Sequence, residues 1–263
     1  MKRRLLLFIP MYNCEKQIKR VIGRIGTEAQ EHLAEILVAD NSSADGSLGA
    51  ARQALAGLPG IRATLVRNTR NYSLGGSLKI AFNYCLENNY DHCIVLHGDD
   101  QADIGDILPC LKDETFFEYD CAFGSRFLPG SSLHGYSKMR ILGNRALNGL
   151  TSLVGKRAVS DLGSGLNMYK MAYLKDRFYT RFPDNLTFDV YMLLYCLLAK
   201  ASLMFFPISW SESDQKSNAR AFRQGLKILQ LLLQYSVNAK AIFAAPGGPE
   251  PAYSCEIVYS HAP

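Results

Sequence analysis

The sequence predicts an α/β fold with a mostly parallel sheet and helices on both of its faces. In the first hundred residues, short apolar runs alternate with polar loops and stretches of helical spacing, the rhythm of a doubly wound sheet. The run 93–96 is almost continuously apolar, as in strands buried on both faces of a parallel sheet. No Gly-x-Gly-x-x-Gly follows the first run and no Walker loop occurs, so the dinucleotide fingerprint and the P-loop are both absent.

The predicted elements follow in order. Strands are expected at 5–9, 35–39, 62–67 and 93–96, separated by helices at about 13–25, 47–58 and 77–88. The second half is expected to hold a short strand before 122–127, helices at 139–153 and 190–199, a strand at 205–208 and an amphipathic helix at 222–237. That last helix has Leu226, Leu229, Leu233 and Val237 on one apolar face, and docking onto the core is favoured over lying on a membrane. The stretch from Ala244 resembles a linker.

Composition excludes several classes of protein. The chain has 263 residues, 48% of them apolar, enough for one large domain or two small ones with a sizeable core. A net charge of +5 suits a phosphate-bearing substrate or an anionic membrane surface, and is too small to indicate nucleic acid binding. Seven cysteines, an odd number without a Cys-x-x-Cys pair, favour a reducing compartment over a disulfide framework or a zinc site.

Two apolar stretches resemble targeting or membrane segments. The run 5–9 ends at Pro10 without a small-residue cleavage site, which favours a first strand over a signal peptide. The span 190–208 is interrupted by Lys200 and Ser202, and its unbroken part would extend about 15 Å as a helix, half of a bilayer core. We therefore expect a buried helix followed by a strand.

Polar side chains follow three of the predicted strands at the edge where open α/β sheets bind ligands. Asp99 and Gln101, two apart on an extended exit, could share a hard divalent cation, although acidic residues after a strand can equally form a turn. Tyr12 offers a flat ring for a base, and Asp40 can accept from base or ribose donors or serve only as a cap. Gly75 and Gly76 either let the backbone approach a diphosphate or simply make a turn.

An ordered set of motifs resembles family 2 glycosyltransferases of the GT-A fold, a Rossmann-like architecture. The motifs are Pro10-x-Tyr12-Asn13-x-Glu15, Val38-x-Asp40-Asn41-x-Ser43-x-Asp45-Gly46, Asn71 through Gly75-Gly76, and His97-Gly98-Asp99-x-Gln101. Over about residues 4–235 the chain looks most like the branch of dolichyl- and polyprenyl-phosphate sugar synthases. The resemblance implies one domain over 1–240, with a nucleotide-binding half at about 1–125, an acceptor half at about 126–240 and a tail at 241–263.

The resemblance also implies where an activated sugar would bind. Asp99 and Gln101 would hold Mg²⁺ or Mn²⁺, and the first aspartate of the family's Asp-x-Asp-x-Gln signature is replaced by His97. A neutral imidazole cannot add the charge of a carboxylate, but it can hydrogen-bond a ribose or a phosphate. The remaining donor contacts would come from Pro10, Tyr12, Asn13, Glu15, Asp40, Asn41, Ser42, Gly75, Gly76, His97 and Gly98.

In the second half, the resemblance places Arg126 beside the donor sugar or phosphate and Asp161 and Ser164 beside the sugar. Asp189 would lie near the acceptor, as a base for a hydroxyl acceptor or as an orienting group for a lipid phosphate. The capping of a helix is its alternative role. Ser217 and Arg220 belong to a stretch that resembles a loop closing over the diphosphate.

The predicted function is metal-dependent transfer of a sugar, with inversion, from a nucleoside diphosphate sugar to a polyprenyl phosphate or another membrane lipid. Two alternatives remain at this point. One is a sugar-1-phosphate nucleotidyltransferase, and the other is a non-catalytic module that binds a nucleotide sugar. A cytoplasmic location is expected, with peripheral contact at the inner face of the cytoplasmic membrane and no nucleic acid partner.

Overall fold

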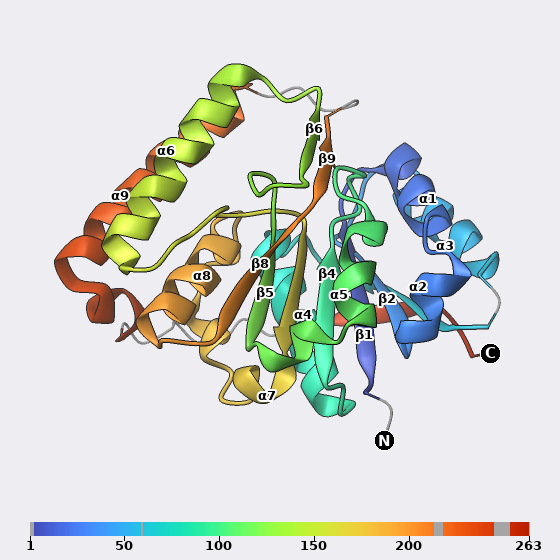
Figure 1. Cartoon of the computed structure of the whole chain (residues 1–263). Helices are drawn as coiled ribbons and strands as arrows, with labels where there is room; N and C mark the ends of the chain where they lie inside the picture. Colours follow the sequence, from blue (N-terminus) through green and yellow to red (C-terminus); the bar gives the residue numbers. More distant parts are fainter. Residues whose placement is uncertain (1–2, 59, 213–217, 245–252, 263) are drawn as a thin grey trace.

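The computed structural model describes residues 3–58, 60–212, 218–244 and 253–262, without the side chains of 218–222 (Figure 1). Within these residues, eight strands form one sheet in the order β10-β3-β2-β1-β4-β7-β5-β8. Their bounds are β1 Leu5–Met11, β2 Glu35–Asp40, β3 Arg62–Asn68, β4 His92–Leu96, β5 Cys121–Ser125, β7 Leu166–Lys170, β8 Leu203–Pro207 and β10 Cys255–His261. Two short strands, β6 (Ser132–His134) and β9 (Ser209–Ser211), pair separately.

The sheet is mostly parallel, which confirms the prediction. β1 pairs in parallel with β2 and β4, β2 with β3, and β5 with β8, whereas β7 and β10 run antiparallel to their neighbours. The four strands β3, β2, β1 and β4 are therefore adjacent and point the same way. Their carboxyl ends lie along one edge of the sheet, and the loops that leave them meet there.

Helices cover both faces, as predicted. The bounds are α1 Glu15–Gly23, α2 Thr27–His32, α3 Ser47–Ala56, α4 Ser73–Glu87, α5 Leu108–Lys112, α6 Lys138–Gly155, α7 Met171–Leu174, α8 Phe188–Leu198 and α9 Asn218–Ala244, with 3-10 turns at Ile104–Ile107, Thr115–Glu118 and Phe178–Arg181. Alternate residues of β1 face opposite ways. Leu6 and Phe8 join a core with α4 and α8, while Leu7 and Ile9 join a second core with α1 and α3.

Three segments differ from the sequence prediction. α4 begins at Ser73, four residues earlier than expected, so both glycines lie in its first turn. The expected helix 13–25 ends at Gly23 and is followed by the separate helix α2. The stretch expected to be a tail contains β10, which pairs with β3 and forms an edge of the sheet.

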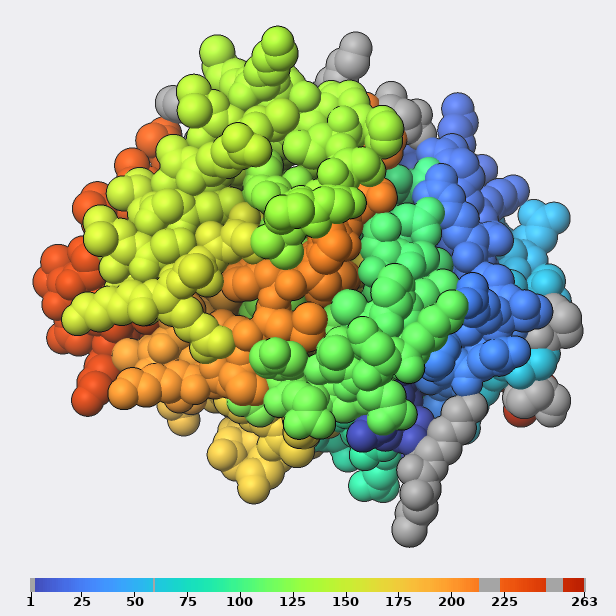
Figure 2. Space-filling model, viewed as in Figure 1, coloured from blue at the N-terminus to red at the C-terminus, as the bar shows by residue number. Residues whose placement is uncertain are grey.

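The helices α6 and α9 lie side by side away from the centre of the sheet (Figure 1). In the space-filling view they form one margin of the molecule, yellow-green beside red (Figure 2). Leu226, Leu233 and Val237 of α9 are 52%, 61% and 87% exposed, whereas Leu231 and Leu232 are buried. α9 therefore docks onto the core, as expected, but it does so through Leu231 and Leu232 and not through the predicted apolar face. Among the described residues, no helix has the length and apolar content needed to cross a membrane.

Candidate functional site

The loops that follow β1 and β2 are joined at the carboxyl edge of the sheet. The Asn13 backbone N–H donates to Ser43 Oγ at 3.0 Å, and Asn13 Oδ1 accepts from the Ala44 N–H at 2.9 Å. The Glu15 N–H donates to Asp45 at 3.3 Å. Asn13 has a φ of +49°, a left-handed conformation that Asn tolerates better than most residues. Two predicted donor contacts, Asn13 and Glu15, thus help to build this corner of the site.

A cleft with about 370 Å³ of open volume lies at this edge. It is lined by Pro10, Met11, Tyr12, Cys14, Asn41, Asn71, Ser73, Leu74, Ser77, His97, Gly98, Asp99, Asn185 and Leu186. The lining therefore comes from all four loops that follow the parallel strands, and from the segment before α8. Tyr12 is half exposed, which leaves one side of its ring available for stacking. The expected convergence of polar loops on one cleft is present for Tyr12 and Asp99.

Asp40 lies beneath the cleft and does not line it. Its side chain is fully buried, and its carboxylate accepts from the Ser43 N–H at 3.2 Å and lies 3.5 Å from Arg67 Nε. The Asx-type turn that Asp40 makes with Ser43 is a common use of a carboxylate after a strand. Asp40 thus stabilises the loop after β2 without capping a helix, and the next residue, Asn41, reaches the cleft instead.

Asn41 organises the loop that follows β3. Its Oδ1 accepts from Asn68 Nδ2 at 3.0 Å and from the Tyr72 N–H at 2.8 Å, while its Nδ2 donates to Asn71 Oδ1 at 2.9 Å. Ser42 donates to the carbonyl of Asn68 at 2.7 Å. These bonds tie the second and third loops together, so that Asn41 and Asn71 present a fixed polar wall to the cleft.

Gly75 and Gly76 are needed for close packing within the protein. A Cβ on Gly75 would lie 2.7 Å from the Pro183 carbonyl oxygen and 2.8 Å from Asp184 backbone atoms, and the Gly75 N–H donates to the Asp184 carbonyl at 2.6 Å. A Cβ on Gly76 would lie 2.5 Å from Tyr72 Cβ. The chain itself therefore fills the space beside both glycines and accepts the hydrogen bond of the Gly75 N–H.

Asp99 and His97 contribute a carboxyl group and an imidazole ring to the lining of the cleft. Burial raises the pKa of the Asp99 carboxyl, and the nearby His97 opposes that shift. The Nε2 atom of His97 is buried and has no hydrogen-bond partner among the described residues. The ring is close to Gly165, where a Cβ would lie 3.2 Å from the His97 side chain.

The loop that carries Asp99 is anchored on both sides. Asp100, at a φ of +63°, turns its buried carboxylate away from the cleft and binds Arg20 Nε at 2.5 Å and Arg24 at 2.6 Å. The carbonyl of Gln101 accepts from the Ser211 N–H at 2.9 Å. Gln101 is not among the residues that line the cleft.

A divalent cation fits this corner when a substrate supplies most of its ligands. In the described residues, no three His, Cys, Asp or Glu side chains are grouped so as to hold a metal by themselves. Mg²⁺ in nucleotide sites is commonly held by one or two carboxylates together with phosphate oxygens. The desolvated Asp99 carboxylate and the unpartnered His97 nitrogen fit such a site.

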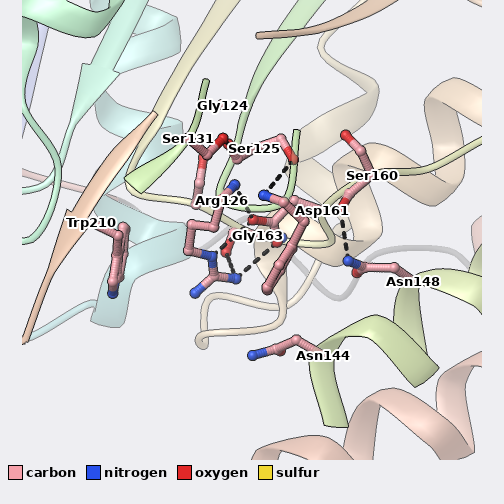
Figure 3. A network of polar contacts seen from close by, with 12 residues as sticks. Gly124, Ser125, Arg126, Ser131, Asn144, Asn148, Ser160, Asp161, Gly163 and Trp210 are labelled. Carbon is pink, nitrogen blue, oxygen red and sulfur yellow. Dashed lines mark hydrogen bonds and ion pairs between the residues drawn. The ribbon is translucent and has the colours of Figure 1, made fainter. Parts of the chain in front are cut away.

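Arg126 and Asp161 bind one another (Figure 3). Arg126 Nε and Nη2 each donate to the Asp161 carboxylate at 2.8 Å, and Nη2 also donates to the Gly163 carbonyl at 2.7 Å. Nη1 donates to the Tyr136 hydroxyl at 3.2 Å, and the guanidinium lies 4.9 Å from the Trp210 ring centroid. The charged groups expected at the phosphate and the sugar are therefore engaged with each other, outside the residues that line the cleft.

The other two site residues predicted in the second half whose side chains are described are Ser164 and Asp189, and both are buried. The Ser164 hydroxyl is buried and donates to the Leu166 carbonyl at 3.2 Å. Asp189 is buried in the first turn of α8, just beyond the cleft residue Leu186. Burial raises the pKa of the Asp189 carboxyl, and His97 and Tyr169 oppose the shift. His97 is thus near carboxylates from both halves of the chain.

Two predicted contacts cannot be placed. Ser217 lies outside the described residues, and Arg220 belongs to α9 but its side chain is not described.

Several cleft residues were missed from the sequence. Ser73, Leu74 and Ser77 reach the cleft because α4 begins at Ser73, and the sequence hint was the Asn71–Ser73 turn. Asn185 and Leu186 arrive through tertiary packing, and no local pattern marks them.

The chain matches a protein family and curated relatives. The model of the family described as glycosyl transferase family 2 matches residues 7–178, more than half of the chain. Polyprenol monophosphomannose synthase from Mycolicibacterium smegmatis is 25% identical over 173 residues, 66% of this chain and 64% of the relative. An uncharacterised protein of Methanocaldococcus jannaschii is 27% identical over 64% of this chain and 65% of its own length. The chain thus spans slightly less than two thirds of these relatives.

Solved structures share the fold. Glucosyl-3-phosphoglycerate synthase from Mycobacterium tuberculosis, in complex with Mn²⁺, uridine diphosphate and phosphoglyceric acid, has a TM-score of 0.62 at 12% identity, over 99% of this chain and 90% of that one. A mannosyltransferase from Pyrobaculum calidifontis, in complex with GDP-Man and Mn²⁺, has a TM-score of 0.62 at 18% identity, over 95% of this chain and 67% of that one. These likenesses confirm the predicted GT-A fold. The family match, which spans more than half of the chain, establishes that this chain belongs to glycosyl transferase family 2.

Proposed function

We propose that this chain transfers a sugar, with inversion, from a nucleoside diphosphate sugar to a lipid phosphate or another membrane lipid. The observation that carries the proposal is the cleft at the carboxyl edge of β3, β2, β1 and β4, which places the half-exposed Tyr12 ring and the partly buried Asp99 carboxylate in one space. A nucleoside diphosphate needs a flat surface for its base and a cation site for its phosphates. Solved relatives of the same fold bind uridine diphosphate or GDP-Man with Mn²⁺.

The base and ribose would lie between Tyr12 and the polar wall of Asn41 and Asn71. The phosphates would lie toward Gly98 and Asp99. A Cβ at Gly98 would lie 3.0 Å from the Pro10 carbonyl, so a glycine is what allows the β1 and β4 loops to pack closely here. A Mg²⁺ or Mn²⁺ ion held by Asp99, with Gln101 and His97 nearby, would neutralise charge on the departing diphosphate.

Asp189 is the candidate residue on the acceptor side. A buried carboxyl whose pKa is raised is a better base near neutral pH than an exposed aspartate. A hydroxyl acceptor would require this proton transfer. A lipid phosphate is already anionic, and Asp189 would then orient the acceptor.

Transfer to a lipid acceptor would require the protein to contact a membrane. The margin formed by α6 and α9 has the composition expected of such a contact surface. Nine of the chain's 29 Lys and Arg residues, and none of its 24 Asp and Glu residues, lie in 138–157 and 218–244. Apolar side chains project from the same two helices, with Met139, Leu142 and Leu153 of α6 at least 71% exposed. A surface that combines exposed apolar side chains with cations and lacks acids is attracted to anionic lipid headgroups. Self-association through this face would bring like charges together.

The test begins with binding of UDP- and GDP-sugars, measured by calorimetry with and without Mn²⁺. Transfer to a polyprenyl phosphate in anionic vesicles is measured next, and the anomeric configuration of the product is read by NMR. We expect the protein to bind the sugars of only one of these nucleotides, in a Mn²⁺-dependent way, and to form a product with inverted anomeric configuration. Both the binding and the product should be lost in Asp99→Ala. Donor binding without transfer or hydrolysis would favour a non-catalytic module. Release of pyrophosphate from a nucleoside triphosphate and a sugar phosphate would favour a nucleotidyltransferase.

A further inference from the structure

The segment 182–187 follows the turns that come after β7 and leads into α8. It forms one wall of the cleft. Asn185 and Leu186 line the cleft, and Asn185 Oδ1 accepts from the Thr187 N–H at 2.8 Å and from its hydroxyl at 2.6 Å. α8 begins at the next residue, Phe188, and carries Asp189 in its first turn. The placement of this segment therefore determines the placement of both the wall and Asp189.

Lys79 of α4 holds this segment from the buried side. Its ammonium donates to the Phe182 carbonyl, to Asp184 Oδ1 at 2.7 Å and to the Tyr253 hydroxyl at 3.2 Å. A lysine ammonium has three N–H donors, so all three have an acceptor. Lys79 is 2% exposed, and a buried ammonium requires such a complete set of partners.

Tyr253 closes the network from the opposite end of the chain. Its hydroxyl donates to Asp184 Oδ1 at 2.6 Å while it accepts from Lys79. Its ring packs edge-on against Tyr72, with centroids 5.3 Å apart and an interplanar angle of 78°. Tyr72 is the residue before α4, so Tyr253 contacts both the third loop of the cleft and the wall segment.

The pairing of β10 explains why a C-terminal residue reaches this place. β10 runs antiparallel to β3, with Cys255 opposite Asn68, the last residue of β3. The start of β10 therefore lies at the carboxyl edge of the sheet, and Tyr253 stands just before it. The N–H of Ser254 donates to the Tyr72 hydroxyl at 3.2 Å, which fixes the approach.

We propose that Tyr253 is a positioning residue that, through Asp184 and Lys79, holds the 182–187 wall and the start of α8 in place for sugar transfer. The kinetic part of this inference rests on the proposed function, whereas its structural part does not. The donor's base and phosphates would contact mostly Tyr12, Asn41 and Asp99, none of which the Tyr253 hydroxyl touches. Loss of that hydroxyl should therefore affect turnover more than donor binding.

The test is Tyr253→Phe in the full chain, which keeps the ring and its contact with Tyr72 and removes the hydroxyl. We expect amide hydrogen exchange over 183–190, measured without substrate, to become about tenfold faster, because the segment loses one of its anchors. We expect kcat to fall about tenfold, with the KM for the donor within twofold of the wild-type value. Tyr259→Phe is the matched control and should change neither readout, because it removes a tyrosine hydroxyl from β10 that makes no hydrogen bond to the described residues.

A second variant, Asp184→Asn, removes the negative charge of the carboxylate to which both Lys79 and Tyr253 donate. Because both substitutions disrupt one network, the double variant should exchange no more than about twofold faster than the more affected single variant. Unchanged exchange over 183–190 in Tyr253→Phe, or fully additive effects in the double variant, would overturn the proposal. If the wild type transfers no sugar while the exchange result holds, the positioning role stands and the proposed function fails.

Discussion

Arg126 and Asp161 form a two-point ion pair, with Nε and Nη2 of the guanidinium each 2.8 Å from a different carboxylate oxygen. Both side chains are buried, and the Arg126 N–H also donates to Asp161 at 3.0 Å. The pair connects β5 to the loop before β7, and so holds together the second half of the sheet next to the cleft.

We predict that Asp161→Asn destabilises the protein by about 3 kcal/mol, because breaking a buried pair leaves an uncompensated charge. Urea unfolding measures the change. The double variant Arg126→Met/Asp161→Leu should recover most of the loss, since well-packed apolar residues can replace a buried pair. A single variant within about 0.5 kcal/mol of the wild type would show that the pair contributes little.

Asp189→Asn should raise the melting temperature of the unliganded protein by a few degrees at pH 7. The pKa of the Asp189 carboxyl is raised by burial, so this carboxyl favours folding only at low pH, and that contribution is lost as the pH rises through its folded-state pKa. His97 and Tyr169 face the carboxyl and reduce the effect. Thermal unfolding from pH 4 to pH 8 should show the two proteins converging at the acidic end. A gap that widens toward acid would contradict the sign.

Gly75→Ala should cost about 1–3 kcal/mol, since its new methyl group would collide with backbone atoms of Pro183 and Asp184 at under 3 Å. Gly149→Ala is the matched control in α6, where nothing lies within 4 Å of the added Cβ. That substitution should stabilise the protein by about 0.5–1 kcal/mol, because alanine is the better helix former. Equal effects of the two substitutions, measured by urea unfolding, would remove the packing explanation.

His97→Asp should tighten Mn²⁺ binding in the presence of the donor nucleotide by about tenfold. A carboxylate adds a negative charge and an oxygen ligand, which Mn²⁺ prefers to imidazole. Calorimetric titration measures the affinity, with His134→Asp, in the exposed part of β6, as the control. An unchanged affinity would remove His97 from the cation site.

Leu142→Glu together with Val237→Glu should weaken binding to vesicles rich in anionic lipid by about tenfold, since both the apolar contact and the electrostatic attraction are reduced. Ile257→Glu is the control, because Ile257 is comparably exposed (71%) but lies on β10 at the far edge of the sheet. Co-sedimentation with vesicles gives the readout. Equal binding by all three proteins would exclude the α6–α9 margin as the lipid-facing surface.

The first four strands could be predicted to within about two residues because each contains a short run of mostly apolar residues that is buried in the sheet. The order of the polar loops then indicated one cleft, which the positions of Tyr12 and Asp99 match. β10 escaped prediction because its apolar run is only three residues long, Ile257 to Tyr259, and because its partner lies nearly two hundred residues earlier.

The pairing of charges could not be predicted. Sequence marks Arg126, Asp161 and Asp40 as polar residues after strands, but not which groups they bind once the chain is folded. Asp161 is 35 residues from Arg126, and Asp40 meets Arg67 from the neighbouring strand. In the sequence, the two glycines at the start of α4 resemble a loop, because the segment that requires them, 183–184, is more than a hundred residues away.

The place of β10 beside β3 has a consequence for solubility. Without its antiparallel neighbour, the seven-residue strand Arg62–Asn68 would present a row of unsatisfied backbone amides and carbonyls to solvent. Such a row is a template on which strands of other molecules can add. A version of the chain cut before residue 253 should therefore aggregate, and the final strand acts as a cover that keeps separate copies apart.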